Sequence, residues 1–241
     1  MSRYSRFTSS DIGYPSWSRA VRMLIITCIV VFALQTFEEI SGGRTLTRTF
    51  GLVPALVTQS FFLWQLVTYI FLHGGAFHIL FNMLGLWMFG SDLERLWGFR
   101  KFTKFFFICG IGAGIVTVLA SPSSPIPTIG ASGALYGILL AFGMFFPNRI
   151  IILIIFPIRA KYLVLIMGGL AFYSALVASG NGVANIAHLG GMLFGLIYLK
   201  GGKIMSGVKW RYEKWQRQRL RKKFDVYYNE KHRKDNDRWR N

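Results

Sequence analysis

The sequence predicts an all-α, polytopic membrane protein whose six helices form a bundle. Hydrophobic residues make up 53% of the 241-residue chain and the mean hydropathy is +0.41, which is too apolar for a soluble domain of this length. The apolar residues also gather in six stretches that are long enough, or nearly so, to cross a bilayer. These stretches are Ala20 to Phe37, Ala76 to Gly90, Phe102 to Ala120, Gly130 to Pro147, Tyr162 to Ser179 and Ala184 to Leu199.

The charged residues orient the chain. If the amino terminus lies in the cytoplasm, all 28 lysines and arginines except Arg44 and Arg48 fall on the cytoplasmic side. The positive-inside rule therefore predicts that both termini are cytoplasmic. We expect three parts: a cytoplasmic segment over 1–19 with no soluble amino-terminal domain, a six-helix domain over 20–200, and a basic cytoplasmic tail over 201–241.

The tail supplies much of the net charge of +18, since fifteen lysines and arginines follow from Lys200 onward. Aromatic residues are interleaved with them. Such a segment could bind nucleic acid, but next to a last span on the cytoplasmic side it favours anionic lipid headgroups. We expect membrane lipids as partners of the tail, and no nucleic acid.

The first stretch follows arginines, as the apolar core of a secretory signal peptide does. It ends in Ala33-Leu34-Gln35 and so lacks the small-x-small ending that a signal peptidase needs. We therefore expect a retained helix. Two further apolar runs are expected to lie outside the spans. Phe50 to Leu66 is expected as a partly immersed loop, because Gly51, Pro54 and Gln59 interrupt it, and Ile150 to Pro157, which is too short to span, as an interfacial loop piece.

The fourth stretch opens on Gly130-Ala131-Ser132-Gly133, after an uncharged, proline-containing loop over 121–128. The prolines keep the helix from starting early, and the two glycines allow the backbone to approach another helix or a ligand closely. The unpaired N–H groups at a helix amino terminus also suit a developing oxyanion. A Gly-x-Ser-Gly match alone fits a helix cap or a packing residue as well, so the role of Ser132 is open at this point.

The sixth stretch carries a single histidine, His188, with two glycines three and seven residues later on the same helical face. Two glycines of the fourth stretch form a matching seam of small residues, which would let the two helices approach until Ser132 meets His188. The glycines of the two seams are Gly133, Gly137, Gly191 and Gly195. A polar or ionisable residue at membrane depth is a functional candidate, although a lone buried histidine is commonly a structural hydrogen-bonding group.

No carboxylate lies between Glu94 and Glu213, so a conventional catalytic triad is excluded and a Ser–His dyad is expected. Tyr136 lies one turn after Ser132 and could support the imidazole by ring packing or a hydrogen bond, although ordinary helix packing explains it equally well.

The second stretch places His78 and Asn82 four residues apart on one helical face, at about the depth of Ser132, where both could donate hydrogen bonds to an oxyanion. His73, just before this helix, is expected to tie down the preceding loop or to act as a second polar group of the site.

Other chemistries are excluded by inspection. Cys28 and Cys109 lie inside predicted spans and are expected to be buried as small hydrophobes rather than to form a disulfide. The sequence has no cysteine-based zinc spacing and no His-Glu-x-x-His motif, so we expect no metal and no cofactor. An aspartyl intramembrane enzyme is excluded too, because every aspartate lies outside the predicted spans: Asp11, Asp92, Asp225, Asp235 and Asp237.

In this order and on these stretches, the motifs resemble those of the rhomboid intramembrane serine proteases. The resemblance covers about Phe50 to Lys200 and includes a turn over Glu94 to Gly98. It implies that Ser132 is the nucleophile and His188 the general base and then acid. It also implies an oxyanion hole formed by His78, Asn82 and the backbone N–H of Ser132, with Tyr136 packed on the imidazole. Gly130 and Gly133 match the family's serine loop, and Gly191 and Gly195 match its close helix contact.

The resemblance further implies that the substrates are transmembrane helices of other proteins, cut near their outer ends at small residues. A bacterial inner membrane is the expected location. One departure concerns the first outer loop, where many relatives have Trp-Arg and this chain has Trp64-Gln65, which leaves open how the loop is anchored. The alternative function is that of a catalytically silent rhomboid-like protein that binds and escorts transmembrane helices. A transporter would show repeated halves or charges within the spans, and the sequence has neither.

Overall fold

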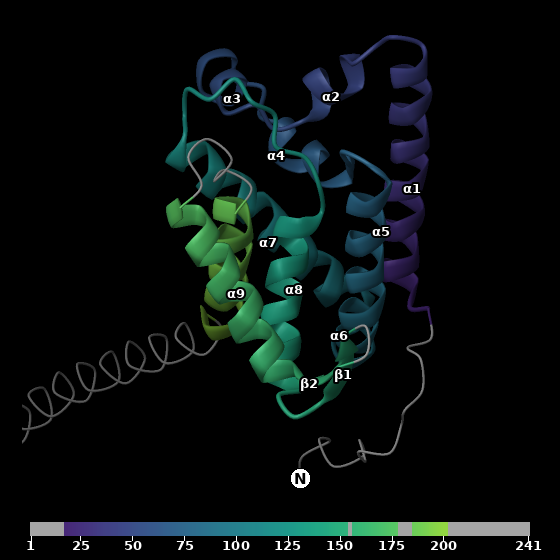
Figure 1. The fold of residues 1–241 in the computed structure, drawn as a ribbon, viewed down its shortest axis with the longest axis vertical. Helices are drawn as coiled ribbons and strands as arrows, with labels where there is room; N and C mark the ends of the chain where they lie inside the picture. Colours follow the sequence, from purple (N-terminus) through teal and green to yellow (C-terminus); the bar gives the residue numbers. More distant parts are fainter. Residues whose placement is uncertain (1–16, 154–155, 178–184, 202–241) are drawn as a thin grey trace, which may run out of the picture. The chain divides into compact units, whose positions relative to one another are not determined.

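The described part of the chain is dominated by apolar helices. A computed structural model describes residues 17–153, 156–177 and 185–201 (Figure 1). Helices α1 (Arg19–Ile40), α7 (Phe99–Ala120) and α9 (Ala160–Val177) are each long and apolar enough to cross a membrane. They agree with three of the predicted spans, although Ser179 lies outside the described residues. The all-α, polytopic membrane architecture is thereby confirmed.

The second predicted span is longer than expected. It consists of α5 (Ala76–Gly85), a π-helical turn η2 (Leu86–Gly90) and α6 (Ser91–Trp97), which follow one another without a break. The expected end at Gly90 is therefore wrong. The expected turn over Glu94 to Gly98 is present at the end of α6, where the Gly98 N–H donates to the Glu94 carbonyl at 2.7 Å and Gly98 takes a φ of +82°.

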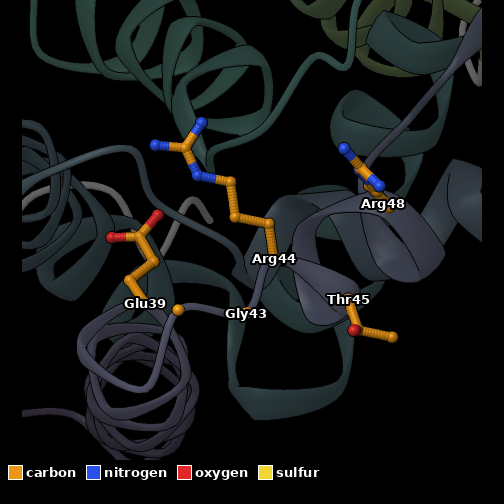
Figure 2. A pocket seen from close by; sticks show the side chains of 6 residues that line it. Glu39, Gly43, Arg44, Thr45 and Arg48 are labelled. Carbon is orange, nitrogen blue, oxygen red and sulfur yellow. The ribbon is translucent and has the colours of Figure 1, made fainter.

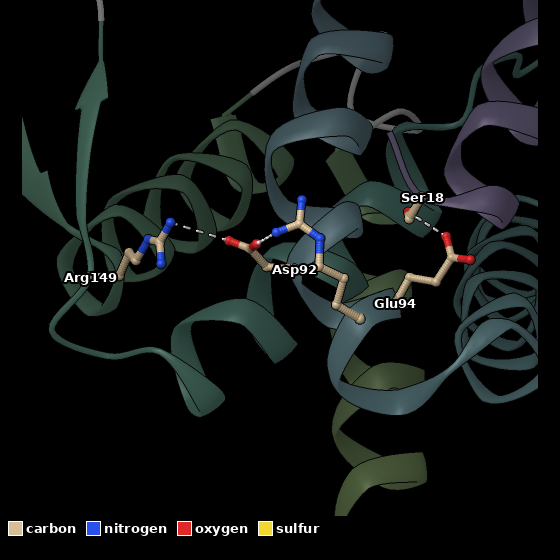
Figure 3. Close-up of polar contacts among 5 residues, drawn as sticks. Ser18, Asp92, Glu94 and Arg149 are labelled. Carbon is tan, nitrogen blue, oxygen red and sulfur yellow. Dashed lines mark hydrogen bonds and ion pairs between the residues drawn. The ribbon is translucent and has the colours of Figure 1, made fainter. Parts of the chain in front are cut away.

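The added turns carry Glu94, which is 5% exposed. Its carboxylate accepts hydrogen bonds from the backbone N–H groups of Ala20 (2.8 Å) and Val21 (3.0 Å) and from the Ser18 hydroxyl (Figure 3). Two of these donors are backbone N–H groups that lack a partner within α1, since they lie in its first turn. Glu94 thus caps α1 and joins α6 to it.

Helix α8 (Ser132–Phe145) is shorter than the predicted span over Gly130 to Pro147. It cannot begin at Gly130, whose φ of +122° lies outside the helical region. The helix packs against α5, α7 and α9. The last predicted span corresponds to helical residues 185–201, and Ala184 lies outside the described residues.

The run over Ile150 to Pro157 is not the predicted loop piece but part of an antiparallel hairpin of β1 (Ile150–Leu153) and β2 (Phe156–Arg159), with Ile151 opposite Ile158. The isoleucines favour extended backbone. A hydrogen bond of 2.9 Å from the Ala160 N–H to the Arg149 carbonyl closes the hairpin next to α9.

The predicted loop over Phe50 to Leu66 also contains regular structure. It includes α3 (Pro54–Ser60) and borders α2 (Thr45–Phe50) and α4 (Gln65–Thr68), and a 3-10 turn, η1 (Tyr69–Phe71), follows. Figure 1 shows α2, α3 and α4 gathered at the end where α1 finishes, while the hairpin lies at the opposite end.

Gln65 anchors this loop. Its side chain is 0% exposed and its Nε2 donates to the carbonyls of Arg48 (3.4 Å) and Thr49 (3.2 Å), while its Oε1 accepts from the Val53 N–H (3.0 Å). The indole N–H of Trp64 adds a bond to the Thr49 carbonyl at 3.0 Å. A neutral amide suffices here because it can donate and accept at the same time.

Candidate active site

Ser132 and His188 meet between two helices. Ser132 is the first residue of α8, and His188 projects from the helical segment over 185–201. The Ser132 Oγ and the His188 Nε2 are 2.8 Å apart, a hydrogen-bond distance, and both residues are half-buried. This is the separation that proton transfer from a serine to a histidine requires.

The glycine seam accounts for the closeness of the two helices. A Cβ on Gly191 would collide with the Gly133 carbonyl, and one on Gly137 would lie 2.8 Å from the Gly191 carbonyl oxygen. Farther along, a Cβ on Gly195 would lie 3.3 Å from the Gly137 Cα. Backbone therefore packs directly on backbone, which larger residues would prevent.

Tyr136 holds the imidazole by ring packing, the first of the two modes considered from the sequence. The rings of Tyr136 and His188 are stacked, with centroids 4.1 Å apart and an angle of 3° between their planes. The other ring nitrogen of His188, Nδ1, is buried and has no hydrogen-bond partner among the described residues. Stacking is therefore the contact that fixes the plane of the ring.

His78 lies close to Gly130, two residues before the serine. A Cβ on Gly130 would be 2.8 Å from the His78 Nε2, so only glycine allows this approach. The Gly74 N–H donates to the His78 Nδ1 at 3.3 Å. Since Nδ1 accepts, the proton of the neutral imidazole belongs on Nε2, which makes Nε2 a donor directed at the serine loop.

The amide of Asn82, 4% exposed, lies one helical turn from His78. Its Nδ2 donates to the His78 carbonyl at 2.8 Å. An amide nitrogen carries two hydrogens, so a second N–H is present for a ligand. His73 is 2% exposed, and its ring lies edge-on to that of His78, with centroids 5.2 Å apart.

The loop that leads into Ser132, the serine loop, is fixed by bonds to η1 and to the segment between α2 and α3. The Gly130 N–H donates to the Tyr69 carbonyl at 2.9 Å, and Thr128 forms a two-bond bridge with Leu52. Tyr69 is in turn held by its hydroxyl, which donates to the Gly110 carbonyl at 2.7 Å. Sequence reasoning missed Tyr69 and Leu52, because both bind the serine loop through backbone atoms, which every residue type has.

Two other places are not part of the site. A polar pocket lies between the end of α1 and α2, lined by Glu39, Gly42, Gly43, Arg44, Thr45 and Arg48 (Figure 2), and neither Ser132 nor His188 borders it. In the part of the chain that the structure describes, no cluster of three histidine, cysteine or acidic side chains could hold a metal ion. Cys28 and Cys109 are free thiols, both 0% exposed, as predicted.

Together, fold and site define a class: a helical membrane protein with a serine and a histidine hydrogen-bonded between two packed helices. The family model of the rhomboid domain matches residues 60–201, which is more than half of the chain. The chain belongs to the rhomboid family and is an integral membrane protein.

Three relatives illustrate the relationship. The chain is 35% identical over 162 residues to rhomboid protease GluP of Bacillus subtilis, a match that covers 65% of this chain and 30% of GluP. It is 33% identical over 133 residues to the mitochondrial Rhomboid protein 1 of Saccharomyces cerevisiae, covering 53% of this chain and 38% of that protein. RHOMBOID-like protein 1 of Arabidopsis thaliana is 31% identical over 170 residues, a match that covers 69% of this chain and 42% of that protein.

The chain thus spans less than half the length of these three relatives. The family includes a protein named as a protease, so protease activity is supported at the level of the family. Because the relatives come from a bacterium, a fungus and a plant, the bacterial inner membrane stays a prediction.

Proposed function

We propose that the protein is an intramembrane serine endopeptidase that hydrolyses peptide bonds in or near the transmembrane helices of other membrane proteins. The observation that carries the proposal is the 2.8 Å contact between the Ser132 Oγ and the His188 Nε2. Membership of the rhomboid family adds to it, because named proteases belong to that family.

In the proposed mechanism, the His188 Nε2 removes the hydroxyl proton as the Ser132 Oγ attacks the carbonyl carbon of the substrate. The negative charge that develops on the carbonyl oxygen is met by the His78 Nε2–H, an Asn82 N–H and the backbone N–H of Ser132. The imidazolium then gives its proton to the leaving amine, and an acyl-enzyme remains. Water, deprotonated by His188, hydrolyses the ester and regenerates Ser132.

Tyr136 has a supporting role in this proposal. Its ring covers one face of the imidazole at 4.1 Å, which keeps the ring plane fixed while Nε2 gains and loses a proton. His188 has no carboxylate partner among the described residues, so stacking takes over the orienting role that an aspartate has in a triad.

The preference for substrate helices with small residues at the cut rests on the resemblance alone. The orientation with both termini in the cytoplasm rests on the positive-inside rule. Beyond Gly201 the tail lies outside the described residues, so its binding to lipids stays a prediction.

Cleavage of a model single-span protein by the purified chain in detergent tests the proposal. We expect Ser132→Ala and His188→Ala each to lower turnover by about 10⁴-fold or more while the fold persists. The matched control is Ser41→Ala, because within the described residues the Ser41 hydroxyl bonds only to its own helix, at the Phe37 carbonyl.

Cleavage by Ser132→Ala at the wild-type rate would rule out Ser132 as the nucleophile. Absence of cleavage by any variant, the wild type included, over several substrates would instead favour a protein that binds transmembrane helices without cutting them.

A further inference from the structure

Gln35 stands out in α1 because its polar side chain is buried. It is 4% exposed, whereas its neighbours Leu34 and Phe37 are 56% and 72% exposed. An amide buried in an apolar helix is costly unless its hydrogen bonds are made. The partners of Gln35 therefore show what the residue does.

Both ends of the Gln35 amide are used, and both partners belong to other segments. Its Oε1 accepts from the backbone N–H of His73 at 3.0 Å, and its Nε2 donates to the Thr47 Oγ1 at 3.2 Å. The side chain thus joins α1, α2 and the turn between η1 and α5. Among the described residues, no other hydrogen bond of α1 reaches the backbone of that turn.

The turn that Gln35 holds is the one that orients His78. The His73 ring lies edge-on to the His78 ring at 5.2 Å, and the next residue, Gly74, donates its N–H to the His78 Nδ1 at 3.3 Å. The Nδ1 bond directs the N–H of Nε2 toward the serine loop. A shift of the backbone at His73 and Gly74 would move both contacts at once.

We infer that Gln35 is a positioning residue: it fixes the backbone of the turn at His73, and through that turn it holds the imidazole of His78 in place beside Ser132. This inference rests on the proposed function for its kinetic consequences, whereas its structural content does not depend on catalysis. Positioning matters because small displacements of a donor from a developing oxyanion lower its effect.

The test compares Gln35→Leu with Gln35→Glu and with Thr36→Val. Leucine has a similar size but makes neither bond. A protonated glutamic acid keeps a carbonyl acceptor for the His73 N–H and an O–H donor for Thr47, so it should restore the tether. Thr36→Val is the matched control, since the exposed Thr36 hydroxyl bonds, in the part of the chain that the structure describes, only to its own helix, at the Phe32 carbonyl.

Kinetics with a single-span substrate should show a kcat about tenfold lower for Gln35→Leu at an unchanged KM, with most of the loss restored in Gln35→Glu. In a His78→Ala background, Gln35→Leu should cause no further loss, since a residue that acts through His78 has nothing left to position. A kcat like that of Thr36→Val, or an equal loss with and without His78, would overturn the inference.

Amide hydrogen exchange, followed on a peptide that covers residues 69–79, provides a readout without catalysis. Gln35→Leu should speed exchange there by about tenfold relative to the wild type and to Thr36→Val, because the His73 N–H loses its acceptor. Unchanged exchange would overturn the inference. If the wild type shows no cleavage that depends on Ser132, the proposed function fails, and the exchange result alone decides on the tether.

Discussion

At the end of the bundle that carries Ser132, two uncharged amides are among the buried side chains that join one segment to another. At the opposite end a buried carboxylate does this work. Gln35, which is 4% exposed, joins α1 to α2 and to the turn before α5, and Gln65, which is 0% exposed, joins α4 to the chain between Arg48 and Val53. Glu94, which is 5% exposed, joins α6 to the start of α1 (Figure 3). Glu38 also accepts bonds at the Ser132 end, from α2, but it is only half-buried.

The difference has a physical reason. A charged group is expensive to keep away from water, so buried charge is tolerated best near the membrane surface or opposite a ready set of donors, such as the start of α1. An amide can join segments in a site whose electrostatics must stay undisturbed, because it adds no charge beside His78 and His188. We therefore expect changes at the Ser132 end to affect both catalysis and stability, and changes at the opposite end to affect stability alone.

The largest effect should come from Gly191→Val, which breaks the seam beneath the site. A side chain there collides with the Gly133 carbonyl, so the helices must separate. We expect loss of cleavage and a free energy of unfolding lowered by about 3 kcal/mol, measured by unfolding in mixed micelles. Gly169→Val is the control, since a Cβ on Gly169 would have no neighbour within 4 Å. Equal effects of both substitutions would show that the close packing of the two helices at Gly191 is not the cause of the loss.

Gln65→Leu should have the next largest effect, because it leaves the Val53 N–H and the carbonyls of Arg48 and Thr49 without this partner. We expect the free energy of unfolding to fall by about 2 kcal/mol and kcat to fall with it. The exposed Gln59 offers the control Gln59→Leu. A Gln65→Leu protein with unchanged stability, or a destabilised protein with full kcat, would contradict the comparison.

Glu94→Gln tests the opposite end. The substitution keeps the shape but turns an amide N–H toward the donors of Ala20, Val21 or Ser18, so about 1 kcal/mol of stability should be lost. Because these contacts are remote from His188, kcat should change less than about twofold. Measuring kcat and unfolding on the same preparation checks both statements, with the exposed Glu39→Gln as control. A large fall in kcat would contradict the division between the two ends.

The smallest effect is expected for Asp92→Asn. Asp92 pairs with Arg95 at 3.2 Å and with Arg149 at 3.7 Å, and both arginines are well exposed (Figure 3). Such pairs contribute at most about 1 kcal/mol, and salt screens them. Stability should therefore fall by less than about 1 kcal/mol, and the difference from the wild type should shrink as salt is added. A difference that does not depend on salt would show that Asp92 acts by hydrogen bonding rather than by charge.

The sequence was most informative where a feature repeats along one helix. The apolar length of α1, α7 and α9 and the glycine spacing of the seam follow from local geometry, so they could be predicted. In the same way, the spacing of Ser132 and Tyr136 predicted that both residues lie on one face of α8. The stacking of Tyr136 on His188 was among the arrangements that this spacing allowed.

Prediction failed where a residue acts on a distant segment. Nothing around Gln35 reveals that its partner is the backbone of His73, and nothing around Glu94 reveals that it caps α1. The short isoleucine run before α9 failed as a loop prediction for another reason: the hairpin is local, but a run this short does not show by itself that its two halves pair, as Ile151 does with Ile158. Contacts to backbone are independent of residue type, so a single sequence carries little trace of them.

The length of α8 determines how deep Ser132 lies in the membrane. With 14 residues and a rise of about 1.5 Å per residue, the helix is about 21 Å long, roughly 9 Å less than the hydrocarbon thickness of a bilayer. Helix α8 is therefore too short to reach both surfaces of the membrane. Its Phe145 end is followed by Arg149, which is ion-paired with Asp92 and partly exposed, so that end lies near the surface. Ser132 must then lie about 9 Å below the opposite surface, and a bilayer thinned by a few ångströms would bring it closer to water.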